Sequence, residues 1–211
     1  IAQESCYQVS YKDVCDNQSG VSVEACPIVL NGALQKDNII NLSWSHYLGW
    51  RNGVDNYILE KYSDTGVLLQ TFTPGTALSY SDDDQDLTNQ IYHYVVRANA
   101  SEAGLLQAVS NRVTIIKNPN IFYPTAFTPN GDNLNDTFNV FGQYITSFEM
   151  NIFNRWGELM YTTSVLDEGW DGNFRGNPMP EGTYAFIADI TDMAGRTFTK
   201  SGSVLLLRKT K

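Results

Sequence analysis

The sequence predicts an all-β protein built from two consecutive β-sandwiches behind a short β-hairpin. Charged residues make up 18% of the 211 residues, below the roughly one quarter that is usual in soluble domains. Hydrophobic residues reach 42% and aromatic residues 12%, enough for packed cores. Short alternating apolar runs recur between clusters of Gly, Asn, Asp and Ser, which is typical of strands joined by turns.

Charge and hydropathy exclude several classes of protein. The net charge is −9 and no basic cluster occurs, so nucleic acid is not expected as a partner. No apolar run approaches the roughly 18 residues of a membrane-spanning helix. No signal peptide opens the chain, so we expect the C-terminal region of a longer protein, monomeric as it stands. The acidic run Asp82–Asp86 favours a solvated loop over a cation site.

Residues 1–26 predict two strands around the turn DVCDNQSG. They are too few to bury a core, so we expect the terminal hairpin of a truncated preceding domain. The hairpin would place Cys6 opposite Cys26, which predicts a disulfide between them and leaves Cys15 over. A disulfide suits an extracytoplasmic protein. A zinc site is less favoured, because no CxxC spacing or nearby His exists.

Residues 27–117 predict a β-sandwich from the runs IINLSW, NYILEKYS, VLLQTFT, YHYVVRANA and NRVTII. This region resembles a fibronectin type III domain, an immunoglobulin-like sandwich, in the order of four features. They are Trp44, the run YILEKY, Leu87 five residues before Tyr92, and the run SNRV. The resemblance implies that Trp44 is the buried strand tryptophan and Tyr92 the corner tyrosine. It also implies that one face of the same strand continues with Tyr94, Val96 and Ala98.

The segment Lys117–Pro124, KNPNIFYP, is the expected linker, because its two prolines disfavour strand pairing. Residues 118–211 then predict the second, immunoglobulin-like sandwich. In SFEMNIFNRWG one face is apolar, with Phe148, Met150 and Ile152. The stretch FGQYITSF predicts one helical turn.

The sequence offers no catalytic constellation. His46 and His93 lie in expected strands and are expected to be surface or satisfied residues, and no GxSxG, HExxH or phosphate-binding glycine loop occurs. Two carboxylate pairs, Asp167 with Glu168 and Asp132 with Asp136, could do acid–base work, but both lie in turns without a sign of a cleft. We therefore expect no enzyme.

The stretch Phe127–Phe138, FTPNGDNLNDTF, raises the question of calcium. Counted from Asn130, position 5 is Leu134 and position 12 is Phe141, so the oxygen ligands of an EF-hand are missing. Two alternatives remain: an array of Asx-turns, in which side chains bond their own backbone, or a looser calcium site. The residues of that site would be Asp132, Asn133, Asn135 and Asp136.

Three further turn motifs follow: NRWGE, GWDG and GNPMPEGTY, at residues 154–158, 169–172 and 176–184. Each places Gly where a positive φ is expected, next to an aromatic or charged residue. The simplest interpretation makes Trp156 and Trp170 core anchors.

Four stretches, taken in order, closely resemble the gliding motility-associated C-terminal domain, the type B sorting domain of the type IX secretion system of Bacteroidota. They are FYPTAFTPNGDNLNDTF, FEMNIFNRWGELMY, GWDGNFRGNPMPEGTYAFIADI and GSVLLLRK. Asn133 stands where the family usually has Gly, a mild departure because Asn tolerates left-handed φ. The resemblance assigns the sorting motif to Asn130, Gly131, Asp132, Asn135, Asp136, Asn154, Arg155, Trp156, Gly157, Trp170, Asp171, Gly172, Gly182 and Tyr184.

The resemblance implies a large secreted or cell-surface protein, adhesin-like, whose last domain is an address and performs no reaction. It would be exported through the periplasm and outer membrane and attached at the surface. Its partners would be the outer-membrane components of type IX secretion, including a porin-like protein.

The closing stretch SGSVLLLRKTK predicts a strand whose run Val204–Leu207 packs into the sandwich. Arg208, Lys209 and Lys211 would form a basic tip that steers toward an acidic receptor, or merely a solubilising tail. The main rival function is a carbohydrate- or surface-binding adhesin module, with Trp50 in the turn YLGWRNG as its aromatic. A second rival, a structural spacer, leaves the concentration of turn motifs unexplained.

Overall fold

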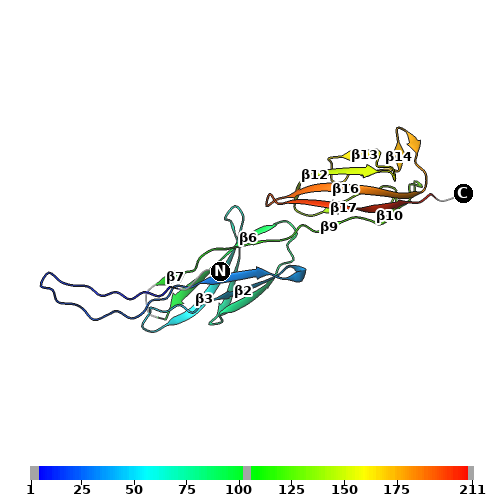
Figure 1. Ribbon diagram of the computed structural model, residues 1–211. Helices are drawn as coiled ribbons and strands as arrows, with labels where there is room; N and C mark the ends of the chain where they lie inside the picture. Colours follow the sequence, from blue (N-terminus) through cyan, green and yellow to red (C-terminus); the bar gives the residue numbers. More distant parts are fainter. Residues whose placement is uncertain (1–4, 102–105, 209–211) are drawn as a thin grey trace. The chain divides into compact units, whose positions relative to one another are not determined.

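The computed structural model describes residues 5–101 and 106–208 and divides the chain into two compact units, Ile1–Lys117 and Asn118–Lys211 (Figure 1). Both are built from strands, and the only helical turn among the described residues is η1 (Lys36–Asn38). The prediction of an all-β fold of immunoglobulin-like sandwiches is confirmed. Within the same residues, no helix combines the length and apolar character needed to cross a membrane.

The first unit is a sandwich of two antiparallel sheets. One sheet has the order β1 (Leu30–Leu34), β2 (Ile39–Trp44), β5 (Ser79–Asp83). The other has the order β4 (Leu68–Gly75), β3 (Val54–Ser63), β6 (Ile91–Ala100), β7 (Gln107–Val109), with β8 (Val113–Ile116) also on β6.

The core of this unit lies where the alternation of apolar residues placed it. Trp44 is buried and meets the Tyr57 ring edge-on at a centroid distance of 6.0 Å. The inward face of β6 is fully buried, as predicted, and consists of Tyr92, Tyr94, Val96 and Ala98. Leu87, by contrast, is exposed.

Residues 5–26 form a ribbon of two extended arms that leaves the sandwich (Figure 1). The arms are joined by the bridges Tyr7–Ala25 and Lys12–Gln18 and by a Cys6–Cys26 disulfide at the base. Cys15 is a free, exposed thiol near the turn. Along the ribbon the apolar side chains face solvent, among them Tyr7, Val9, Tyr11, Val21 and Val23.

The second unit has one five-stranded sheet and two short pairs of strands. The sheet has the order β10 (Ala126–Phe127), β17 (Thr197–Leu206), β16 (Gly182–Asp192), β12 (Ile145–Phe153), β13 (Leu159–Thr163). The pairs are β9 (Ile121–Phe122) with β11 (Phe141–Gly142), and β14 (Asn173–Phe174) with β15 (Asn177–Pro178).

The predicted face of β12 is buried, with Phe148, Met150 and Ile152 in one core with Trp170 and Phe186. The helical turn predicted for FGQYITSF is wrong. Those residues instead form β11, a tight turn and the start of β12. Extended alternation therefore outweighs the local propensity of this stretch.

Candidate recognition site

Four turn motifs that lie apart in the sequence meet at one end of the second sandwich. They are Asn130–Asp136, Asn154–Glu158, Gly169–Gly172 and Gly176–Tyr184, and we call their surface the motif end. Gly182, where β16 begins, pairs with Leu206, where β17 ends. The β12–β13 turn and the loop after β10 lie at the same end, because β12 ends opposite the start of β16 and β10 runs parallel to β17.

The first motif is a loop whose backbone N–H groups are held by the side chain of Asp136. Oδ1 of Asp136 accepts the N–H groups of Asn130 and Gly131, each at 2.8 Å, and Oδ2 accepts that of Asn133 at 2.7 Å. The bond from Gly131, with those from Asn133 and Asn130, holds the pKa of Asp136 below its ordinary value. Gly131, Asn133 and Asn135 have positive φ, so Asn133 adopts the left-handed conformation expected of that position.

This geometry favours the Asx-turn array over calcium. Both oxygens of Asp136 face N–H donors, and Asp132 accepts the N–H of Leu134 at 2.9 Å. In the described part of the chain, the one group of three His, Cys, Asp or Glu at metal-binding distances is Cys6, Glu24 and Cys26. Two of its members are the disulfide sulfurs, so that group offers no thiolate ligands.

The second motif is a rigid turn that presents an exposed aromatic ring. Oδ1 of Asn154 accepts the N–H groups of Trp156 and Glu158, at 2.9 and 3.0 Å, and Gly157 has φ 81°. Trp156 is 77% exposed, and the Arg155 guanidinium lies 4.6 Å from its ring centroid. The expectation that Trp156 anchors the core is therefore wrong: the turn holds its ring away from the sandwich.

The third motif buries its aromatic residue. Trp170 is fully buried and its Nε1 donates to the carbonyl of Asn173 at 2.8 Å. Its ring packs on Tyr184, from the fourth motif, at 4.7 Å between centroids, and Tyr184 donates to the carbonyl of Pro180. For Trp170 the core-anchor interpretation is confirmed.

Arg208 ties these segments together at the end of β17. Its Nη2 donates to the carbonyl of Gly172 and its Nε to that of Met179, both at 2.9 Å. Its backbone N–H donates to the carboxylate of Glu181. The expected free basic tip is therefore wrong for Arg208, because its guanidinium bonds two loops of its own domain. Lys209 and Lys211 lie outside the described residues.

These contacts of Arg208 could not be predicted from the sequence, since backbone carbonyls in distant loops have no residue signature. The run before it packs in alternation: Val204 and Leu206 are buried, whereas Leu205 and Leu207 are partly exposed. The expectation that all four residues pack inward is thus half right.

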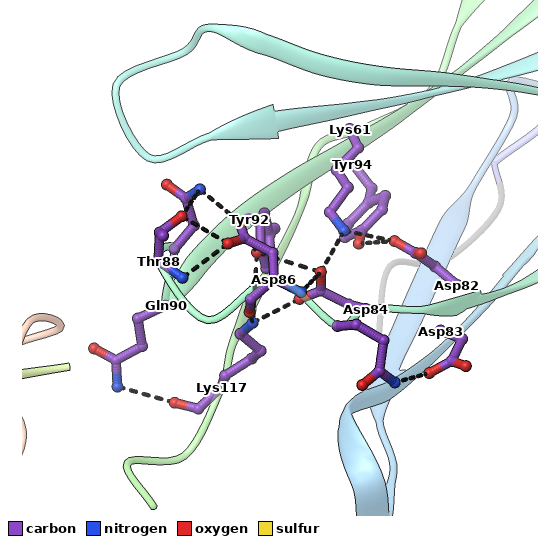
Figure 2. A network of polar contacts seen from close by, with 12 residues as sticks. Lys61, Asp82, Asp83, Asp84, Asp86, Thr88, Gln90, Tyr92, Tyr94 and Lys117 are labelled. Carbon is purple, nitrogen blue, oxygen red and sulfur yellow. Dashed lines mark hydrogen bonds and ion pairs between the residues drawn. The ribbon is translucent and has the colours of Figure 1, made fainter. Parts of the chain in front are cut away.

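The acidic run of the first unit is not a solvated loop (Figure 2). Asp82 and Asp84 are buried with Lys61 and Lys117. Lys61 Nζ lies 2.8 Å from Asp82 and 3.1 Å from Asp84, and Lys117 Nζ lies 2.7 Å from Asp84. Lys117 thus belongs to the first sandwich and not to a linker. Alternation explains Lys61, which follows Tyr57 and Leu59 on the inward face of β3.

The side chains of this buried network bond one another, and those bonds set their ionisation. Burial opposes ionisation of Asp84, but the hydrogen bonds from Lys117 and Lys61 outweigh it, and the pKa of Asp84 lies below its ordinary value. Burial and the neighbouring carboxylates raise the pKa of Tyr92 and of Tyr94. Tyr94 donates to Asp82 at 2.7 Å and Tyr92 to Asp86 at 2.9 Å.

The remaining candidates do not come together. Trp50 packs partly buried against the core, with its ring 4.3 Å from that of Tyr47, so it is not a free binding aromatic. His93 contacts Thr114 and Asp64, as a satisfied histidine does, while His46 is exposed and bonds the adjacent carbonyl of Tyr47.

Fold and site together define a β-sandwich module whose distinctive part is a surface of rigid turns, which suits recognition by another protein. Residues 121–206 match the family model described as the CHU_C type IX secretion signal domain. This part of the chain is a type IX secretion signal domain, and the protein that carries it is exported to the cell surface or the extracellular space. It therefore interacts with the type IX machinery, and modules of this kind are typically non-catalytic.

Among solved structures, a two-domain fibronectin type III segment of chicken tenascin matches with a TM-score of 0.51 and 13% identity, over 83% of this chain and 97% of that one. At that identity the match shows the fold alone. A tetra-tandem repeat from the extending region of a large adhesion protein matches with a TM-score of 0.37 and 13% identity, over 96% of this chain and 56% of that one; a score this low carries no argument. No curated protein matches the chain.

Proposed function

We propose that the motif end is the surface by which the type IX machinery holds this chain during transport across the outer membrane. The observation that carries the proposal is the convergence of four separate motifs on one end of the sandwich. Arg208 bonds two of them, through the carbonyls of Gly172 and Met179. A receptor that reads this surface reads the folded domain, because the segments meet only after folding.

The chemistry of the surface suits protein recognition. Protein interfaces concentrate binding energy in Trp, Tyr and Arg side chains held rigidly, and Trp156 with Arg155 is such a pair. The turn loses little conformational freedom on binding, since Asn154 already fixes two of its N–H groups. The partner is an outer-membrane component of type IX secretion, and a porin-like protein is our candidate.

For the rest of the chain we propose an adhesin-like protein with serial sandwiches. Residues 27–117 serve as a fibronectin type III-like module that spaces the signal from what precedes it. Residues 1–26 are the terminal hairpin of a preceding sandwich, which accounts for their exposed apolar side chains. The packing of Trp50 against the core removes the argument for a carbohydrate-binding module.

The test fuses residues 118–211 to a periplasmic reporter in a strain with type IX secretion. Export of the reporter supports the proposal, and so does its loss when the last strand, Thr197–Leu206, is deleted. Surface display of the deleted form at the undeleted level would contradict it.

A further inference from the structure

One edge of the sheet in the second unit is open. On one side β17 pairs with β16 along its whole length, but on the other side β10 pairs only with Leu205 and Leu206. There the N–H groups of Leu205 and Leu207 donate to the carbonyls of Thr125 and Phe127, each at 3.0 Å. Within the described ranges, no strand pairs with the outer edge of Thr197–Ser203.

The edge is open because the segment that runs beside it, residues 118–125, pairs elsewhere. Asn118 contacts Arg196 at one end of this edge, and Thr125 bonds Leu205 at the other. Between them, β9 pairs with β11 in a separate pair of strands, and two prolines flank it. Proline has no N–H to donate, so this segment is poorly suited to close the gap.

The edge offers an ordered row of backbone groups. Leu205 and Leu207 point their N–H groups outward, and alternate residues of a strand face the same edge. Thr199, Ser201 and Ser203 therefore direct theirs outward as well, and all three are exposed. Edge strands are commonly blunted by charges or proline. Here the only charge on β17 is Lys200.

We infer that an extended segment of the secretion machinery adds as a strand to β17 along Thr197–Ser203. In such strand addition the main-chain hydrogen bonds give the affinity and the alternate side chains give the specificity. A segment with an acidic side chain opposite Lys200 fits the charge of the edge. The added strand would lie on the same side of β17 as β10, which pairs with Leu205 and Leu206 next to the motif end. The inference rests on the proposed function and names the second contact of the same receptor.

The test changes one N–H group on each edge of the same sheet, in the full chain sent to the periplasm of a type IX strain. Ser201→Pro removes an outward N–H, whereas Ser201→Ala keeps it. By the alternation from β17 through β16 and β12, Thr162 directs its N–H outward from β13, the opposite edge strand. Thr162→Pro is therefore the matched control.

Export of the Ser201→Pro chain is expected to fall about tenfold or more, the equivalent of roughly 1.4 kcal/mol of binding. The Thr162→Pro and Ser201→Ala chains should stay within about twofold of the unchanged chain. Lys200→Glu should lower export. Export equal to that of the unchanged chain would mean that the added strand carries no acidic side chain opposite Lys200. The thermal midpoint of each purified chain shows whether it folds.

If Ser201→Pro unfolds the domain, the double variant Thr199→Lys and Ser203→Lys decides, because it keeps every N–H but places two charges on the edge. It is expected to lose export as well. Export of the unchanged chain together with normal export of these edge variants, or equal loss in Ser201→Pro and Thr162→Pro, overturns strand addition and leaves the proposed function standing. If the unchanged chain is not exported, both strand addition and the proposed function are overturned.

Discussion

The two units share a fold class but complete their sandwiches differently. The first buries four charged side chains, and its Lys61 and Lys117 pair with Asp82 and Asp84. The second buries one carboxylate, Asp192, which pairs with Arg196, and its motif end consists of turns whose side chains bond their own backbone. A buried network fixes the interior, whereas self-bonded turns fix a surface. We propose that this difference distinguishes the spacing module from the domain that the secretion machinery recognises.

The largest effect is expected from removing the shared carboxylate of the first unit. Asp84→Ala leaves two buried ammonium groups short of a partner, and breaking a buried ion pair costs about 3–5 kcal/mol. The free energy of unfolding of the first unit should fall by that amount, with the second unit unchanged. Urea denaturation followed by hydrogen exchange of each unit measures both.

The neighbouring Asp83→Ala is the matched control, because Asp83 is the adjacent carboxylate, at the end of β5, and is exposed. Its effect should stay within about 0.5 kcal/mol. Equal losses in the two variants would mean that the network does not stabilise the sandwich.

A smaller effect is expected at Arg208, which bonds two loops of the second unit. Arg208→Ala removes the bonds to the carbonyls of Gly172 and Met179, and charged hydrogen bonds contribute about 1.5–3 kcal/mol. The unfolding free energy of the second unit should fall within or below that range, with export reduced as the loops separate. Arg208→Lys, with one bond at most in the same geometry, should lie between. An unchanged stability would show that the loops hold without Arg208.

How far the sequence predicts these two arrangements depends on the range of the interaction. Strand alternation predicted the buried faces of β6 and β12, since it is a local pattern. The same alternation puts Lys61 on the inward face of β3, two residues after Leu59, whereas the run Asp82–Asp86 was expected to be a solvated loop. Asp82 and Asp84 likewise share one face. These signals were present and were outweighed by the usual exposure of charges.

Trp156 and Trp170 mark the limit of such prediction. Both stand beside glycine in a turn motif, yet one is 77% exposed and the other fully buried. What decides is which segments meet: Phe127 and Tyr184 cover Trp170, whereas the turn at Asn154 holds Trp156 beyond the sheet. The open edge of β17 also follows from long-range pairing. No local pattern carries that information.

The stability of the first unit should respond to acid through Asp84. The pKa of Asp84 is depressed in the folded state, so its contribution to stability is present at neutral pH and is lost as the pH falls below about 4 toward its folded value. Asp84→Asn should therefore flatten the loss of stability of the first unit between neutral pH and about pH 3. Thermal midpoints across this range test it. Parallel curves for the two chains would rule out Asp84 as the titrating group.

The smallest effect on stability, and the sharpest distinction between the units, is expected at Trp156. Because its ring is mostly exposed, Trp156→Ala should change the unfolding free energy by no more than about 0.5 kcal/mol. If the motif end is read by the secretion machinery, the same change should lower export about tenfold or more, as truncation of an interface hot spot does. The matched control is Trp50→Ala in the first unit, a partly buried tryptophan. It should cost more stability and leave export of the folded chain unchanged. Normal export of Trp156→Ala would move recognition away from this turn and toward the remaining motifs and the edge of β17.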